Sequence, residues 1–305
     1  MRVALMIEGQ EGVSWEQWIA LAEACEEHGI ETLFRSDHYL SQGDGGRRDA
    51  LDAWTTLAGL AARTTRLRLG TLVSPVTFRH PAVLAKSAVT VDHISGGRVE
   101  VGMGAGWMEP EHRAYGFPFP ELSERLRLLA EHLETVRSQW TDGPAVPKPV
   151  QKPYPPLIVG GTGGRGTTEP AARFADEYNT LLADPDECAR RRRRLDAACE
   201  RVGRDPATMR FSLMTGCLVA PDASELRERA RRLLVRRGDE GGDPDALVKR
   251  YRERGVAGTP EQVVGRLRQL EDAGRVERVM LQHLQHDDLD MVALIGREVA
   301  PRLAA

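Results

Sequence analysis

The chain has 305 residues, which suits one large α/β barrel or two domains of ordinary size. Hydrophobic residues make up 41% and charged residues 29%, so a sizeable core and a charged surface are both available. The net charge of −3 gives no indication of nucleic-acid binding, which favours strongly basic domains, and no nucleic-acid partner is expected. No apolar run approaches the roughly 20 residues of a membrane span.

The first half alternates short apolar strands with amphipathic helices. A strand at residues 3–7 is followed by a helix that begins with a capping box, Ser14 to Gln17, and ends near Gly29. A second strand is predicted at residues 32–35. The next predicted elements are a helix at 50–63, a strand at 67–73, a helix at 81–93 and a strand at 98–103.

The second half continues the alternation and brings the number of predicted strands to eight. Its elements are a helix at 122–140, a strand at 157–159, a loop at 160–166, a helix at 169–175, a strand at 177–182, a helix at 187–202, a strand at 210–219, a helical segment at 224–255 interrupted at 238–244, a helix from 259, a strand at 276–282 and a helix at 289–303. Eight strand–helix units favour a single (β/α)₈ TIM-barrel domain over residues 1–305, with insertions in the second half. A doubly wound open sheet is the alternative.

Catalytic groups of such a barrel come from the carboxyl ends of its strands and the loops that follow them. This rule selects Glu8 after the first strand and Asp37 and His38 after the second. The fourth and fifth strands both end in glycines, which allow a ligand to approach the backbone closely. We therefore expect the active site at the strand ends that carry these residues.

The loop from Gly160 to Gly166 follows a strand and precedes a helix. Its consecutive backbone N–H groups could hold a phosphate, with Arg165 nearby and the helix N-terminus adding a favourable field. It is not a Walker loop, because no Gly-Lys-Ser/Thr follows. We interpret it as the site of a phosphate-bearing cofactor; a plain flexible loop is the alternative.

Three other patterns are weaker. The stretch from Gly102 to Gly106 resembles the start of a dinucleotide fingerprint but has Trp107 where a third glycine is expected. The arginines at 190–194 are surrounded by acidic residues, which is typical of a solvated helix face rather than a nucleic-acid site. The histidines and aspartates at 283–288 have no recognised metal-ligand spacing, so we expect no metal.

The four cysteines are scattered and form no C-x-x-C motif. This usage is typical of free thiols in a reducing compartment. The first ten residues read as a strand and lack a cleavable signal pattern. We expect a cytoplasmic protein.

The motifs together resemble the bacterial-luciferase-like superfamily of flavin and deazaflavin oxidoreductases. The resemblance is strongest to its actinobacterial branch, which uses the deazaflavin coenzyme F420. Six stretches in about the first 180 residues carry the resemblance, whereas the last 120 or so match only in general pattern. The six stretches are residues 5–10, 34–39, 69–81, 92–98, 102–107 and 155–161.

The resemblance implies a TIM barrel with a flavin-like ring in its mouth, beside Asp37 and His38. It implies a non-proline cis peptide between Leu72 and Val73, pressed against one face of the ring. The other residues that it implies around the cofactor are Ser74, Ala105 and Gly106 near the ring and Gly160, Gly161, Thr162 and Gly163 near the phosphate.

Two residues depart from the deazaflavin sugar-phosphate dehydrogenases of this superfamily. Gln42 replaces a tryptophan that follows the histidine, and Trp107 replaces an acidic residue. Oxidation of a sugar phosphate is therefore not expected.

The main hypothesis is an F420-dependent oxidoreductase that passes a hydride between ring carbon C5 and a small organic substrate, reducing a C=C or C=N bond. In it, His38 is the proton donor or orients the ring, Asp37 sets the His38 tautomer or binds the ring edge, and Glu8 is a second acid or base.

Two alternatives remain. One is an FMN-dependent monooxygenase that uses oxygen and reduced flavin. The other is a non-catalytic barrel that binds a flavin or deazaflavin. We expect a small-molecule substrate, no nucleic-acid or membrane partner, a homodimer by resemblance, and a flavin or F420 reductase wherever reduced cofactor is supplied externally.

Overall fold

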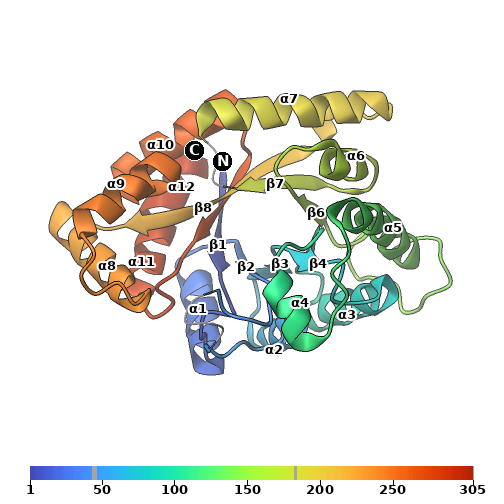
Figure 1. Ribbon diagram of the computed structural model, residues 1–305, viewed down its shortest axis with the longest axis horizontal. Helices are drawn as coiled ribbons and strands as arrows, with labels where there is room; N and C mark the ends of the chain where they lie inside the picture. Colours follow the sequence, from blue (N-terminus) through green and yellow to red (C-terminus); the bar gives the residue numbers. More distant parts are fainter. Residues whose placement is uncertain (43–46, 182–183, 305) are drawn as a thin grey trace.

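A closed barrel of eight parallel strands forms the centre of the computed structural model (Figure 1), which describes residues 1–42, 47–181 and 184–304. Neighbouring strands pair in the order β1, β2, β3, β5, β6, β7, β8 and β10, and β10 pairs back with β1 to close the barrel. The predicted (β/α)₈ fold is confirmed. The barrel strands are β1 Arg2–Ile7, β2 Thr32–Arg35, β3 Arg68–Thr71, β5 Val99–Gly104, β6 Leu157–Gly160, β7 Glu177–Leu181, β8 Arg210–Val219 and β10 Arg278–Gln282.

Helices surround the barrel. The capping box between Ser14 and Gln17 is present at the start of α1, and a second box joins Thr259 to Gln262 at the start of α10. The N-terminal amine donates to the carbonyl of Leu303 at 2.8 Å, so the chain ends lie together (Figure 1). The helices are α1 Trp15–Glu27, α2 Ala53–Arg63, α3 Pro81–Ser95, α4 Glu109–Tyr115, α5 Leu122–Trp140, α6 Arg165–Phe174, α7 Pro185–Arg201, α8 Ala223–Arg236, α9 Pro244–Arg254, α10 Pro260–Gly274, α11 Leu289–Leu294 and α12 Ala300–Ala304, with a π-helical turn at Ile295–Val299.

Side-chain alternation along the strands divides the interior into two layers. In β1, Val3, Leu5 and Ile7 point outward into the core between strands and helices. Ala4 and Met6 point inward and pack inside the barrel with residues such as Phe34 and Ile158. The lower interior also holds Arg278, Glu100 and Glu177, whose charges are paired with one another.

Three strands or α-helices of the structure were not predicted, in addition to a 3₁₀ turn at Pro206–Thr208. β4 (Ser74–Pro75) pairs with β5, and β9 (Val256–Gly258) pairs with β8 outside the barrel. The third is α4. In addition, α6 begins at Arg165 rather than near Glu169, and glycine at position 166 lets its first turn pack directly on Leu126.

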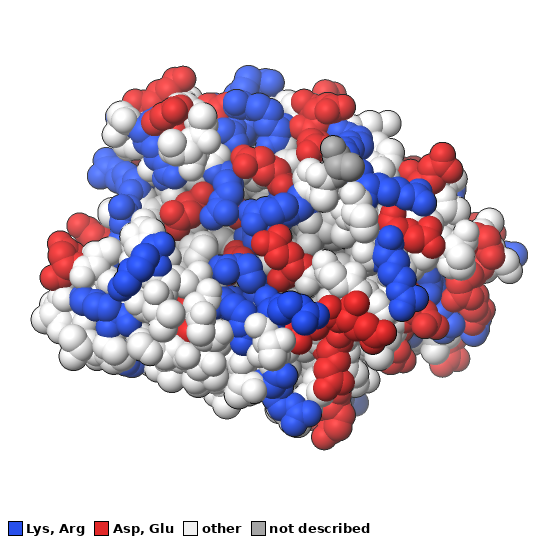
Figure 2. Space-filling model, turned by 180° about the vertical axis from the view of Figure 1, so that it is seen from behind, with Lys and Arg blue, Asp and Glu red and all other residues white. Residues whose placement is uncertain are grey.

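Helices α8 and α9 form an insertion between β8 and β9. They pack on the end of β8 through a small apolar core that includes Leu226, Leu233, Leu247 and Tyr251. Figure 1 shows them at one side of the barrel, next to α11. Figure 2 shows the molecule from behind the view of Figure 1. Acidic and basic side chains are interspersed on that face, so neither sign of charge dominates it.

Candidate active site at the barrel mouth

Asp37 lies at the carboxyl end of β2 and is held by two donors. Its Oδ2 accepts hydrogen bonds from the Ser74 hydroxyl and from Arg79, both at 2.6 Å. Its Oδ1 is buried and has no hydrogen-bond partner among the described residues. A buried acceptor without a donor is uncommon, which marks Oδ1 as a position where a ligand could donate a hydrogen bond.

His38 is held by a carboxylate that sequence reasoning did not find. Its Nδ1 lies 2.8 Å from Oε1 of Glu111, whose Oε2 accepts from the backbone N–H of Tyr39 at 3.1 Å. Because an ionised carboxylate can only accept, Nδ1 carries the proton and Nε2 is left for other partners. Glu111 is 1% exposed and the His38 side chain 12% exposed.

Two opposing effects act on the pKa of His38. Burial disfavours the imidazolium and lowers the pKa, whereas the hydrogen bond and charge of Glu111 raise it. Glu8 and Asp37 add smaller contributions in the same direction as Glu111. The net result is a pKa above the ordinary value of 6.5, so His38 is more readily protonated near neutral pH than an exposed histidine.

Helix α4 places Glu111 through its next residue, His112. The His112 Nδ1 donates to the carbonyl of Met108 at 2.8 Å, so Nε2 accepts from the Thr77 hydroxyl at 2.7 Å. Phe119 packs against the same imidazole with ring centroids 4.6 Å apart. These contacts fix a short helix that has no side-chain N-cap.

Glu8, after β1, is held by two amides. Gln282 donates to Oε1 at 2.6 Å and Gln10 donates to Oε2 at 3.0 Å. Both donors are neutral, and no described residue forms an ion pair with Glu8, so amides alone among the described residues solvate its charge when it is ionised. Glu8 also lies close enough to His38 to affect its pKa.

Val73 forms a shelf where three strands end. The Leu72–Val73 peptide bond is cis, as the family resemblance implies. A Cβ added to Gly104 would lie 2.6 Å from the Val73 side chain, and one added to Gly160 would lie 3.1 Å from it. Glycine at both positions therefore allows Val73 to pack against the ends of β5 and β6.

The glycine-rich loop leaves several backbone donors without partners. Gly163 has a φ of 83°, and its N–H donates to the Tyr178 hydroxyl at 2.8 Å. The N–H groups of residues 164–166, at the start of α6, have no partner among the described residues. Arg165 pairs with Glu169 at the surface. Arg191, from the arginine run assigned to a solvated face, packs against Gly163 and is only 13% exposed.

The structure brings the predicted residues to one end of the barrel. Contacts join Asp37 to Ser74 and Val73 to Gly160, and Gly106 lies beside Thr77. Sequence reasoning missed Glu111 and Arg79. The Glu109-Pro110 start of α4 was an available signal, because proline is common in the first turn of a helix.

Neither a metal centre nor a membrane span is found among the described residues. No group of three or more His, Cys, Asp or Glu side chains in this part of the chain could hold a metal ion. None of the described helices is both long and apolar enough to cross a membrane.

Comparison with known proteins identifies the family of this chain. The model of the family described as luciferase-like monooxygenase matches residues 2–277. The chain belongs to this family. An uncharacterized protein of Mycobacterium tuberculosis is 35% identical over 196 residues, which are 55% of this chain and 68% of the relative. This chain is therefore a luciferase-like oxidoreductase.

Relatives with named activities use two cofactors. An F420-dependent glucose-6-phosphate dehydrogenase of Nakamurella multipartita is 34% identical, over 52% of this chain and 50% of that protein. An FMNH₂-dependent dimethylsulfone monooxygenase of Pseudomonas putida is 29% identical, over 52% and 47%. The chain thus spans about half the length of each.

Solved structures support the fold. The F420-dependent tetrahydromethanopterin reductase of Methanopyrus kandleri superposes with a TM-score of 0.81 at 20% identity, covering 99% of this chain and 100% of that one. A monooxygenase of Streptomyces bottropensis gives 0.81 at 24% identity and 99% coverage of both chains.

Proposed function

We propose that this protein is an F420-dependent oxidoreductase that reduces a C=C or C=N bond of a small organic molecule. The observation that carries the proposal is the arrangement at the mouth: a Val73 shelf bordered by strand-end glycines, next to a histidine whose Nδ1 is fixed by buried Glu111. We expect a flat ring system to lie against this shelf, with His38 as the proton donor beside it.

The residues present fit such a cofactor. The free N–H groups at the start of α6 suit its phosphate, and Asp37 Oδ1 lacks a donor that a ring N–H or hydroxyl could provide. Gly104 and Gly160 let Val73 pack against the strand ends and so form the shelf. Bound reduced F420 supplies a hydride from its ring carbon C5.

The protein's own part is to position the substrate and deliver a proton. Reduction adds a hydride to one atom of the double bond and a proton to the other. His38 is assigned the proton, donated from Nε2, because Nδ1 is committed to Glu111. Glu8, held as an acceptor by Gln10 and Gln282, is assigned to orient the substrate or return a proton to His38.

We do not expect glucose 6-phosphate, the substrate named for one relative, to be the substrate of this protein. Where sugar-phosphate dehydrogenases keep a tryptophan shortly after the histidine, this chain has Gln42, and where they keep an acidic residue, it has Trp107. The Trp107 ring packs edge-on against His38 with centroids 5.7 Å apart and is 62% exposed. An aromatic wall at this place favours an apolar or planar substrate part over a sugar.

The FMN-dependent monooxygenase is the second candidate, and it is supported by the dimethylsulfone monooxygenase relative. The discriminating experiment mixes the protein with reduced F420 and, separately, with reduced FMN supplied by a reductase. A panel of activated alkenes and imines is offered, and F420 oxidation and oxygen uptake are recorded. The proposal expects substrate-dependent F420 oxidation without oxygen uptake.

Oxygen uptake that requires reduced FMN and substrate would instead establish the monooxygenase. Cofactor retention with no turnover in either arm, unchanged by His38→Gln, would support a non-catalytic binding protein.

A further inference from the structure

A polar cavity of about 350 Å³ opens beside Glu8 at the barrel mouth. Its size falls in the range of small-molecule sites, roughly 300–1,000 Å³. It lies between the loops after β1 and β2, the end of β10, and the last turn of α8. Its lining residues are Glu8, Gln10, Glu11, Gln42, Arg48, Leu233, Arg236, Arg237, Gln282 and Leu284.

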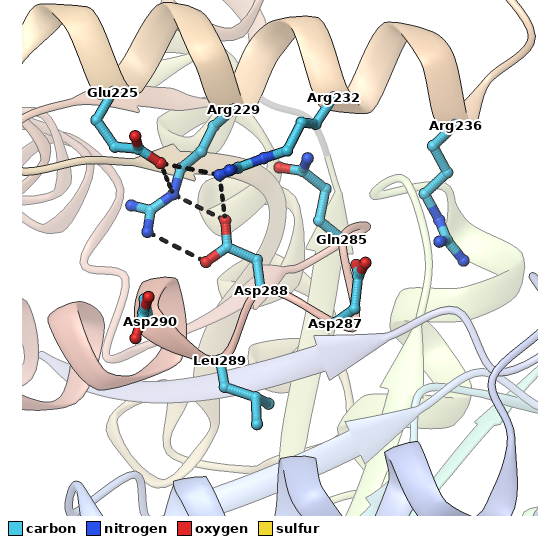
Figure 3. A pocket seen from close by; sticks show the side chains of 9 residues that line it. All are labelled: Glu225, Arg229, Arg232, Arg236, Gln285, Asp287, Asp288, Leu289 and Asp290. Carbon is cyan, nitrogen blue, oxygen red and sulfur yellow. Dashed lines mark hydrogen bonds and ion pairs between the residues drawn. The ribbon is translucent and has the colours of Figure 1, made fainter.

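Arg236, in the last turn of α8, lacks a carboxylate partner. Its Nη2 donates to the carbonyl of Glu11 at 3.0 Å and to Nε2 of His286 at 2.7 Å. No described carboxylate forms an ion pair with it, whereas Arg229 and Arg232 on the same helix both pair with Asp288. Figure 3 shows this difference: dashed lines join those two arginines to acidic groups, and Arg236 stands apart.

The surroundings of Arg236 disfavour its charge. Burial lowers its pKa and the nearby Arg48 lowers it again, whereas Asp287 and, to a smaller extent, Glu11 raise it, and the net result is a lowered pKa. His286 does not help, because burial and Arg236 itself lower the pKa of His286 to about 4 and keep it neutral near pH 7. A half-buried guanidinium in this setting gains from an added anion.

The other charged side chains that line the cavity have hydrogen-bond partners of their own. Glu11 accepts from Arg48 at 3.0 Å and from the backbone N–H of Gln42 at 2.9 Å. Glu8 accepts from amides only. Arg237 donates to the Tyr251 hydroxyl at 2.9 Å and forms no ion pair with a described residue. One wall of the cavity therefore carries two guanidinium groups without carboxylate partners.

We propose that this cavity is the substrate pocket and that Arg236, assisted by Arg237, binds an acidic group of the substrate, a carboxylate or a phosphate. The guanidinium fork matches the geometry of both oxyanions. Leu233 and Leu284 line the apolar part of the substrate, and Glu8 links the cavity to His38. The inference rests on the proposed function, because it names the class of molecule reduced there.

The test is calorimetric titration of the protein with succinate, with inorganic phosphate and with neutral succinamide. Saturable binding of succinate or phosphate, but not of succinamide, is expected, and the anion that binds identifies the class. Arg236→Gln should weaken this binding at least about tenfold, the effect of losing one charged hydrogen-bonded contact. Arg236→Lys keeps the charge but not the forked guanidinium, so its anion affinity should lie between those of the wild type and Arg236→Gln.

Arg231→Gln is the matched control, because Arg231 lies on the same helix, is exposed and pairs with Glu228. It should bind the anion as the wild type does. The proposal is overturned if neither succinate nor phosphate binds the wild type. It is also overturned if both Arg236 variants bind the anion as tightly as the wild type does. The second result is expected if phosphate binds only at the start of α6.

F420 titration of Arg236→Gln separates the two proposals. Unchanged cofactor affinity with lost anion affinity supports both. Anion binding that depends on Arg236 in a protein that binds no F420 would sink the proposed cofactor and the assignment of the anion to a reduced substrate together. Normal F420 binding with no anion binding would sink only the pocket.

Discussion

Replacing Glu111 with glutamine tests the central electrostatic contact of the site. Glutamine keeps the shape of the side chain and can still accept from the N–H of Tyr39, but it removes the negative charge 2.8 Å from His38 Nδ1. Burial of His38, which opposes protonation, is unchanged. The pKa of His38 should therefore fall.

The size of the fall follows from the contact that is lost. A hydrogen bond between charged groups in a buried site contributes about 1.5–3 kcal/mol. One pKa unit corresponds to about 1.4 kcal/mol, so the fall should be about 1–2 units. The sign also applies to stability: a raised folded-state pKa stabilises the fold below about pH 6.5, and this contribution is lost as the pH rises through the raised pKa.

The measurement is an NMR pH titration of the histidine ring protons, with His38 assigned from the signal that is absent in His38→Gln. Glu109→Gln is the control, because Glu109 lies on the same helix but pairs with exposed Arg113. It should leave the titration unchanged. An unchanged His38 pKa in Glu111→Gln would refute the assignment of Glu111 as its partner.

Two further variants test the barrel itself. Burial alone would raise the pKa of Glu100, but two arginines, chiefly Arg278, lower it to about 2; its stabilisation is therefore present above about pH 4.5 and is lost as the pH falls toward 2. Glu100→Gln should lower the free energy of unfolding by about 3–5 kcal/mol, measured by urea denaturation at pH 7, and a loss below 1 kcal/mol would contradict a buried ion-pair role. Gly104→Ala would place a Cβ 2.6 Å from Val73 and should destabilise the fold by about 1–3 kcal/mol and weaken cofactor binding about tenfold or more. Gly265→Ala, in open space on α10, should change stability by less than about 1 kcal/mol and leave binding intact; equal effects of both alanines on binding would refute the shelf.

Local patterns were sufficient to predict most of the barrel. Strands such as β2 and β8 and the helix α5 begin and end where apolar runs, caps and glycines indicate. The capping box at Ser14 is visible as four letters, because both of its hydrogen bonds join neighbours in sequence. Local patterns do not predict short elements. Helix α4 has seven residues, which are too few for a helical period to be recognised.

The site was predicted less completely because its contacts are not local. Glu111 is 73 residues away from His38, and Arg236 lies 225 residues from Glu11. Only the closure of the barrel brings such pairs together. Asp37, His38 and Glu8 could be selected because strand ends of a barrel share one face, whereas the residues that hold them come from other loops.

Titration of the purified protein with F420, FMN and FAD, followed by fluorescence, tests the account most directly. The F420 assignment predicts saturable F420 binding with a Kd in the micromolar range, and weaker F420 binding by Gly104→Ala. No detectable F420 binding together with tight FMN binding would contradict the deazaflavin assignment.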